Sequence, residues 1–209
     1  RKNMIMTRWL QKEFADGGCT SVLDLGCGQS SLLQYIPEIT RSTGVECWAP
    51  YVEESLSLNI HSEYILSDIM DFSAMDGSYD AVMLVDVLEH LEKDEGLTLL
   101  ARMSRWATRK VIVMVPNGYI GQDDTYGDGN TRQRHLSGWT PREFEQLGYH
   151  VRGFHGWKPL RGEAGNIIPT KTKAGHYLLA GISRVSEPVV QVFPSLAYHL
   201  FAVLNLRTS

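Results

Sequence analysis

A short glycine-containing turn is the first feature of this sequence whose residue types suggest chemistry. The run Val22-Leu23-Asp24-Leu25-Gly26-Cys27-Gly28 places an acidic residue inside the end of an apolar segment, followed by two glycines. Glycines let the backbone approach a ligand closely, and open α/β sheets bind ligands at the carboxyl ends of their strands. The Asp24 carboxylate suits a cationic, amine-bearing ligand better than a pyrophosphate, and a turn without any ligand is the structural alternative.

The spacing of the glycines argues against a dinucleotide. A dinucleotide-binding fingerprint reads G-x-G-x-x-G, whereas Ser31 stands where the third glycine would follow Gly26 and Gly28. An NAD(P)-dependent oxidoreductase therefore remains an alternative function that lacks one of its expected residues.

Two more carboxylates follow apolar runs further along the chain. Glu46 comes twenty residues after Gly26. An acidic side chain at that position can accept hydrogen bonds from the hydroxyl groups of a ribose. Asp68 can accept a hydrogen bond from the amino group of an adenine, while Ile69 or Met70 packs on the adenine ring. The structural alternatives are a solvated strand-end carboxylate for Glu46 and an N-cap or Asx turn for Asp68.

Two histidines are the candidate proton acceptors. The run Asp86-Val87-Leu88-Glu89-His90 follows a strongly apolar segment, and His135 lies in a long polar segment. Histidine titrates near neutrality and is the natural general base for a hydroxyl or carbon nucleophile. Each histidine can instead hold its loop by a hydrogen bond.

The segment 117–139 is rich in glycine and polar residues and is the predicted substrate-recognition loop. Loops carried on a rigid scaffold are where selectivity usually resides. Arg132 and Arg134 can clamp a carboxylate or phosphate of an acceptor, and Tyr119 and Trp139 can recognise a polar one. Solvated surface charge is the alternative for the two arginines.

Alternating short β-rich runs and longer helical runs must position these residues, which predicts a parallel sheet covered on both faces. The predicted strands are 21–25, 42–46, 64–67, 79–85, 111–115, 149–157 and 176–184. The predicted helices are 4–14, 30–36, 50–60, 91–107 and 140–147, the fourth predicted from periodicity and the last from a capping box at Thr140 and Glu143 with Pro141 in its first turn.

The C-terminal segment is predicted to form an amphipathic helix beginning near Pro194, because apolar residues recur at helical spacing from Phe193 to Leu204. The domain is therefore predicted over 1–185 and a helical tail over 186–209. Packing on the same domain or in a homodimer is the simpler interpretation of the tail, and contact with a membrane surface is the alternative.

Composition bounds the class of protein. The 209 residues carry a net charge of −4 with a pI of about 6.0, which disfavours a general nucleic-acid binder. The three cysteines match no zinc spacing, and no metal site is predicted in the chain. Their odd number suggests reduced thiols and a cytoplasmic location, extended to a membrane-peripheral one if the tail binds lipid. The first seventeen residues are predicted to be neither a signal peptide nor a membrane span.

In order, the segments VLDLGCGQ, GVE, SDIMDF, YDAVMLVDVLEHL and VIVMVPN resemble the motifs of class I S-adenosylmethionine (SAM)-dependent methyltransferases, well over residues 20–118 and loosely over 140–184. The resemblance implies a Rossmann-like three-layer αβα sandwich whose seven-stranded, mostly parallel sheet ends in an antiparallel strand. It also implies the cofactor contacts: Asp24, Gly26, Cys27 and Gly28 to the methionine part, Glu46 to the ribose, Asp68 and Ile69 to the adenine, and Asp86 and Val87 near the sulfonium.

The same resemblance implies methyl transfer to a small or medium polar acceptor, such as a sugar, a lipid-linked intermediate or a secondary metabolite, with S-adenosylhomocysteine (SAH) as the product. The order Asp-Val-Leu-Glu-His-Leu resembles the branch with ubiquinone-type and small-molecule O-methyltransferases, so oxygen is the favoured acceptor atom, with nitrogen and carbon as alternatives. A non-catalytic subunit with this fold is the competing hypothesis from another class.

Overall fold

The computed structural model describes residues 4–121, 130–162 and 166–206. The chain forms two compact units, one built from residues 1–87, 94–112 and 204–209 and the other from residues 88–93 and 113–203. The helices are α1 (Met4–Gly17), α2 (Ala49–Ser57), α3 (Lys93–Trp106), α4 (Pro141–Gln146), α5 (Lys173–Val185) and α6 (Glu187–Val192).

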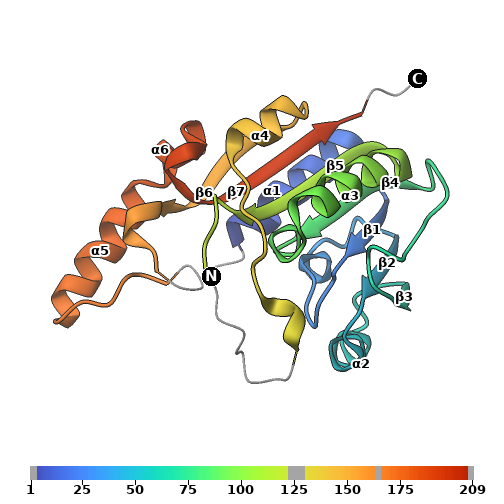
Figure 1. Ribbon diagram of the computed structural model, residues 1–209, viewed down its shortest axis with the longest axis horizontal. Helices are drawn as coiled ribbons and strands as arrows, with labels where there is room; N and C mark the ends of the chain where they lie inside the picture. Colours follow the sequence, from blue (N-terminus) through green and yellow to red (C-terminus); the bar gives the residue numbers. More distant parts are fainter. Residues whose placement is uncertain (1–3, 122–129, 163–165, 207–209) are drawn as a thin grey trace. The chain divides into compact units, whose positions relative to one another are not determined.

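Seven strands form one sheet in the order β3-β2-β1-β4-β5-β7-β6 (Figure 1). Six strands run parallel, and the last strand in the chain runs antiparallel to them. Helices flank the sheet, which confirms the predicted Rossmann-like α/β class. The strand order reverses between β1 and β4, and such a reversal is where open α/β sheets bind their ligands. The strands are β1 (Ser21–Leu25), β2 (Arg41–Glu46), β3 (Glu63–Leu66), β4 (Tyr79–Val85), β5 (Ala107–Pro116), β6 (His150–Trp157) and β7 (Ala197–Asn205).

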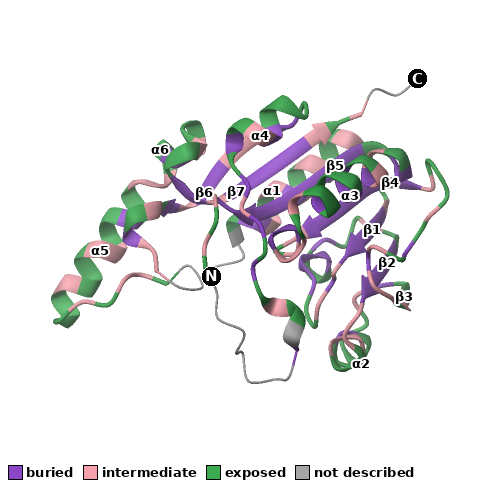
Figure 2. Cartoon of the chain, viewed as in Figure 1, coloured by how far each residue is buried: buried purple, intermediate pink, exposed green. Residues whose placement is uncertain are grey.

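The central strands are apolar because helices or neighbouring chain cover both of their faces. Val22, Leu23 and Leu25 of β1 are fully buried, as are Ala81 and Val82 of β4. Figure 2 shows these two strands almost entirely in the colour of buried residues. Continuous apolar runs of this kind were sufficient to predict the bounds of both strands.

Two of the predicted helices illustrate what local signals can and cannot fix. Helix α4 begins after Thr140, whose side chain accepts from the backbone N–H of Glu143 while the Glu143 side chain accepts from that of Thr140, which confirms the predicted capping box. The predicted helix over 30–36 is only a 3-10 turn (Leu32–Tyr35) capped by Ser31. Pro37 follows directly and prevents a longer helix.

In the C-terminal part of the chain, a helix forms where a strand was predicted and a strand forms where a helix was predicted. Residues 176–184, predicted as a strand, lie within helix α5, and the predicted amphipathic tail helix is replaced by α6 and strand β7. The apolar residues of α5 recur at helical spacing, whereas the continuous apolar run Ala197–Val203 is buried between neighbouring strands. Such short apolar runs have no periodicity that separates a buried strand from a helix.

Strand β7 also removes the predicted domain boundary at residue 185. It pairs antiparallel with β6, with His150 opposite Val203 and Gly153 opposite Leu200. The predicted 186–209 tail is therefore wrong as a separate helical region, because most of it supplies an internal strand of the sheet.

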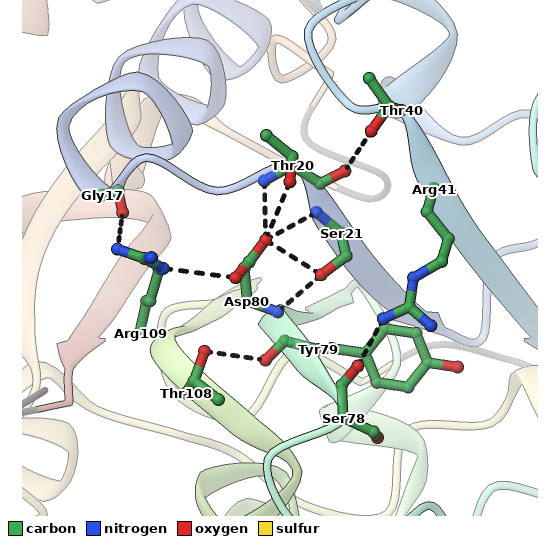
Figure 3. A network of polar contacts seen from close by, with 10 residues as sticks. All are labelled: Gly17, Thr20, Ser21, Thr40, Arg41, Ser78, Tyr79, Asp80, Thr108 and Arg109. Carbon is green, nitrogen blue, oxygen red and sulfur yellow. Dashed lines mark hydrogen bonds and ion pairs between the residues drawn. The ribbon is translucent and has the colours of Figure 1, made fainter. Parts of the chain in front are cut away.

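Asp80 joins the amino ends of neighbouring strands (Figure 3). Its Oδ2 accepts from the backbone N–H groups of Thr20 and Ser21, at 2.9 and 3.0 Å, and from both hydroxyls, while Oδ1 lies 3.3 Å from Nε of Arg109. Burial alone would raise the pKa of Asp80, but these hydrogen bonds lower it to about 2. The ionised carboxylate is thus stabilised in the folded chain.

We expect Asp80→Asn to destabilise the chain at pH 7 by about 1–3 kcal/mol, because an amide cannot accept all of these bonds and turns its NH₂ toward Arg109. The native pKa lies below the unfolded value near 4, so this stability is present above pH 4 and is lost as the pH falls from about 4 to 2. Urea unfolding from pH 7 downward measures it. Asp76→Asn, which removes only an exposed ion pair with Arg105, should change stability by less than about 1 kcal/mol. An Asp80→Asn effect equal to that of the control would contradict the assignment.

Candidate cofactor site and acceptor-side residues

The glycine turn after β1 is held by the end of β2. The backbone N–H groups of Gly26 and Cys27 both donate to the Val45 carbonyl, at 2.7 and 3.1 Å, and that of Gly28 donates to the Glu46 carboxylate at 3.0 Å. Three consecutive amides of the turn are therefore bound to one neighbouring strand. The turn is fixed in shape before any ligand arrives.

The two glycines of the turn have different roles. Both have positive φ, 65° at Gly26 and 58° at Gly28, a region that other residues enter at a cost. A Cβ at Gly26 would stand 2.5 Å from Cγ2 of Val87, whereas no heavy atom of the described chain lies within 4 Å of a Cβ at Gly28. Gly26 thus permits close packing of Val87, and Gly28 leaves open space beside the turn.

Asp24 lies buried beneath the turn with 2% of its surface exposed. Burial raises its pKa, the 2.5 Å hydrogen bond from the Ser31 hydroxyl opposes that rise, and the Glu46 carboxylate adds to it, which leaves a pKa of about 7. His61 lies 3.6 Å away, but burial lowers its pKa to about 4, so the two do not form an ion pair at neutral pH. A cationic group that reached Asp24 would stabilise its ionised form.

The Cys27 side chain does not face open space. A Cβ on Gly44 of β2 would stand 2.9 Å from its sulfur, so the thiol lies against that strand. Burial raises the pKa of the Cys27 thiol, which keeps it protonated and unreactive. A ligand contact predicted for Cys27 would therefore involve its backbone.

Glu46 is the carboxylate most completely engaged by the backbone. Its Oε1 accepts from the amides of Cys47 and Trp48, both at 2.9 Å, and its Oε2 accepts from Gly28. Only 7% of the residue is exposed. Oε1 also accepts from the Cys47 thiol at 3.5 Å. Each carboxylate oxygen offers about two acceptor positions, so the capacity to accept from a ribose hydroxyl is on Oε2.

The remaining predicted cofactor residues follow β3 and β4. Asp68 is half-buried and its Oδ1 accepts from the Met70 amide at 2.8 Å, which is an Asx-type turn. Ile69 is buried with 8% of its surface exposed. Asp86 is exposed and has a φ of 52°, unusual for a residue other than glycine. Its backbone makes a sharp turn directly after β4.

Strand register brings these residues to one edge of the first unit. Leu25, the last residue of β1, is paired with Val45 of β2 and Leu84 of β4, and Glu46 is paired with Leu66 of β3. Because the four strands are parallel, their carboxyl ends are level. The predicted cofactor contacts all lie in or directly after these ends: Asp24, Gly26, Cys27, Gly28, Glu46, Asp68, Ile69, Asp86 and Val87.

The two predicted catalytic histidines meet in the second unit. The ring centroids of His90 and His135 are 4.9 Å apart. His90 Nδ1 lies 3.1 Å from the carbonyl of Arg134, and His135 Nδ1 lies 2.6 Å from that of Ile120. Sequence spacing gave no indication of this pairing, because the two residues are 45 positions apart.

Three of the four predicted substrate residues are exposed and the fourth is buried. Tyr119 is 63% exposed, and Arg132 and Arg134 are exposed, so all three can meet a molecule from solvent. Trp139 is instead fully buried, with its indole N–H donating to Ser137 Oγ at 3.0 Å. The prediction of Trp139 as a substrate contact is therefore wrong. Positions 122–129 of the predicted loop lie outside the described residues.

Lys93 is a residue that the sequence reasoning missed. Its ammonium group lies 3.5 Å from the centre of the Trp139 ring, 2.7 Å from Oε1 of Glu143 and 2.7 Å from the carbonyl of Gly138. These contacts explain why Trp139 is an anchor: a cation–π interaction and a short ion pair hold the segment before α4. The helical pattern of the sequence places Lys93 near the start of α3 but gives no sign of these contacts.

Comparison with known proteins agrees with this geometry. Residues 22–110 match the family model of a methyltransferase domain. Two curated plant enzymes are each 31% identical: (S)-tetrahydroprotoberberine N-methyltransferase of Eschscholzia californica over 104 residues and (S)-coclaurine N-methyltransferase of Thalictrum flavum subsp. glaucum over 103. Each match covers 46% of this chain but only 29% and 28% of the respective enzyme.

Solved structures resemble the chain over nearly its whole length. The methyltransferase domain of bacterial CtHen1 has a TM-score of 0.57 and 19% identity, covering 99% of this chain and 100% of that one. The plantazolicin methyltransferase BpumL, in complex with a pentazolic desmethyl analogue and SAH, has a TM-score of 0.57 and 17% identity, covering 96% and 82%. At such identities the likeness concerns the fold.

The sheet order and the glycine turn are those of a Rossmann-like domain, and the reversal between β1 and β4 is where such sheets bind their ligands. Residues 22–110 match a methyltransferase domain, and the sheet with its flanking helices matches the Rossmann-like methyltransferase fold. The residues fit SAM: Gly28 borders open space, Glu46 retains acceptor capacity, and buried Asp24 favours a cation.

We expect Gly28→Ala to weaken SAM and SAH binding roughly tenfold or more, equivalent to at least about 1.4 kcal/mol, because its methyl group would enter the open space beside the turn. Gly18→Ala is the matched control: Gly18 also has a φ of 60°, and its Cβ would meet nothing closer than 3.7 Å. Both variants should lose about 1–2 kcal/mol of stability. Calorimetric titration with SAH measures the difference, and equal affinities in the two variants would argue against this location of the cofactor.

Proposed function

We propose that this chain transfers the methyl group of SAM to an oxygen of a small or medium polar acceptor. SAM supplies an activated sulfonium methyl group, so the protein mainly has to align and deprotonate the nucleophile. The observation that carries the choice of oxygen is the pair His90 and His135. A hydroxyl needs its proton removed, whereas an uncharged amine needs less help.

The hydrogen bonds of this pair support a role in handling that proton. A backbone carbonyl can only accept, so the Nδ1 atoms facing the carbonyls of Arg134 and Ile120 carry the protons. Each neutral ring then has its lone pair on Nε2, the tautomer that can accept a proton or bind an electrophile. We propose His90 and His135 as the residues that act on the acceptor oxygen.

The exposed side chains of the same unit support a polar or anionic acceptor. Tyr119, Arg132 and Arg134 precede His135 in the segment 117–139. The guanidinium groups of the two arginines bind carboxylates and phosphates well. The two plant relatives are named as N-methyltransferases, so amine methylation is the competing function. Neither a non-catalytic subunit nor an NAD(P)-dependent enzyme accounts for the histidine pair and the glycine turn together.

Paired acceptors that differ only in the nucleophile test the acceptor atom. We expect transfer of labelled methyl from SAM to a sugar or phenol, and weaker transfer to the corresponding amino sugar or aniline. His135→Gln should lower the turnover with a hydroxyl acceptor roughly 10²-fold or more, while SAH binding should stay within twofold of the wild type. Labelling of the amines alone would contradict oxygen methylation. SAH binding without methyl transfer to either set would favour the non-catalytic subunit.

We also propose that helix α5 brings the chain to an anionic membrane surface, where a lipid-linked acceptor would lie. Tyr177, Leu178 and Val185 are 73%, 64% and 78% exposed. They line, with Ile182 and Val189, an open apolar groove of about 550 Å³. An exposed apolar surface of this kind marks an interaction site.

The charges near this face favour anionic lipid over a second copy of the chain. Exposed Lys171, Lys173 and Arg184 lie at the two ends of α5, and the segment 166–186 contains no acidic residue. A helix with an apolar face and basic flanks binds in the plane of an anionic bilayer. Among the described helices, none has the length and hydropathy needed to cross a membrane, so α5 would lie on the surface.

Sedimentation with vesicles tests the membrane surface. We expect the chain to bind phosphatidylglycerol vesicles and not phosphatidylcholine vesicles, and Leu178→Glu to weaken that binding roughly tenfold, because a carboxylate would replace buried apolar contact. The matched control Leu147→Glu, at a 42% exposed position after α4, should bind like the wild type. No binding to the anionic vesicles, or a stable dimer that Leu178→Glu dissociates, would overturn the proposal.

A further inference from the structure

Three side chains with metal-ligating atoms converge in the second unit. One ligand atom from each of Glu89, His90 and His135 lies within 4.8 Å of the others. Glu89 is 3% exposed and His135 is 6% exposed. Buried ionisable side chains are uncommon, and those that occur are mostly paired or coordinate a metal.

The backbone on either side holds these side chains in place. The carbonyl of Glu89 accepts from the amides of Leu136 and Ser137, at 2.8 and 3.1 Å. The Ser137 hydroxyl donates to the carbonyl of Leu88 at 3.3 Å. The segments 88–90 and 134–137 are therefore joined directly beside the three side chains, and the cluster is preorganised by main-chain contacts.

Each imidazole also makes the kind of second hydrogen bond that metal-binding histidines make. Histidines that bind a metal almost always donate their other ring N–H to a carbonyl or carboxylate, which fixes the tautomer and raises the basicity of the ligating nitrogen. Here the Nδ1–H groups of His90 and His135 donate to the carbonyls of Arg134 and Ile120. This assigns the lone pair of each ring to Nε2.

We propose that Glu89, His90 and His135 bind a divalent first-row transition-metal cation. Imidazole suits zinc, iron and nickel, carboxylate suits manganese and magnesium, and the mixed set favours a transition metal over magnesium. Ligand atoms 2.0–2.2 Å from one ion are at most about 4.4 Å apart. The three ligand atoms, within 4.8 Å of one another, are close to this limit.

Three protein ligands leave coordination positions open, which is the arrangement of catalytic rather than structural sites. If the proposed oxygen methylation is correct, the acceptor hydroxyl binds at an open position, where the cation lowers its pKa as it lowers that of bound water. In this arrangement both imidazoles act on the acceptor hydroxyl through the cation, and the proton passes to solvent water. The oxygen then forms a bond to the methyl carbon as the sulfur–carbon bond breaks, and SAH leaves with both electrons of that bond. Metal binding itself does not depend on the acceptor.

Metal content and affinity test the site without any acceptor. Protein stripped with EDTA and titrated calorimetrically with ZnCl₂, MnCl₂ and MgCl₂ should bind one ion per chain, Zn²⁺ most tightly and Mg²⁺ most weakly, following the order of divalent affinities. Glu89→Gln, His90→Gln and His135→Gln should each weaken Mn²⁺ binding roughly 10- to 100-fold or more. His150→Gln, which changes an exposed histidine of β6, is the matched control and should bind as the wild type does.

Folding and function are separated by further measurements. The thermal midpoint and SAH affinity of His135→Gln should match the wild type, which excludes general unfolding as the cause of lost metal binding. Bound Mn²⁺ should show a changed electron paramagnetic resonance spectrum that His135→Gln abolishes. No binding of Zn²⁺ or Mn²⁺, or binding that all three substitutions leave unchanged, overturns the metal site. Metal binding as expected without methylation of any hydroxyl would instead overturn the oxygen acceptor and leave the metal site standing.

Discussion

The proposed cofactor site depends on one constraint, the attachment of the glycine turn after β1 to the end of β2. The amides of Gly26 and Cys27 share the Val45 carbonyl, and the amide of Gly28 is bound by the Glu46 carboxylate. These bonds impose the positive φ values that require glycine. They also set the turn above buried Asp24 and against Val87, so residues from three strand ends meet as a consequence of one set of backbone hydrogen bonds.

The residues proposed to act in the two units are of different chemical kinds. The cofactor residues of the first unit are backbone amides and carboxylates at strand ends, a surface suited to hydroxyl, amino and sulfonium groups. The residues proposed to act on the acceptor, in the second unit, are two imidazoles, a buried carboxylate and exposed arginines, suited to a proton or a cation. In SAM chemistry the methyl group is already activated and the nucleophile is not.

Strand patterns predicted the first part of the fold well. The bounds of β1 and β4 follow from apolar runs ended by glycine or acidic residues, and α4 follows from its capping box. The exchange of helix and strand after residue 175 has a physical origin. The run Ala197–Val203 is apolar at every position but His199, because β7 is internal to the sheet, and spacing within such a run fits a helix equally well.

The common edge of the predicted cofactor residues could be inferred from the sequence, whereas the cluster in the second unit could not. Asp24 and Glu46 lie at the ends of β1 and β2 and Asp68 follows β3, so their common edge is a consequence of parallel topology. Trp139 was misassigned because sequence does not distinguish a buried anchor from an exposed contact. The proximity of His135 to Glu89 and His90 depends on hydrogen bonds between segments more than forty residues apart. Only the folded chain brings these side chains together.

The most direct test of this account is the affinity of Glu46→Gln for SAH, measured by calorimetric titration beside Glu63→Gln, a change at an exposed glutamate that begins β3. A glutamine can still accept from Cys47 and Trp48 but presents an NH₂ group to the Gly28 amide, so the turn loses its attachment at Gly28 while Gly26 and Cys27 stay bound to Val45. The account predicts that Glu46→Gln binds SAH at least roughly tenfold more weakly than the wild type, the loss of about 1.4 kcal/mol, while Glu63→Gln is unchanged. Equal SAH affinity in Glu46→Gln and the wild type would contradict it.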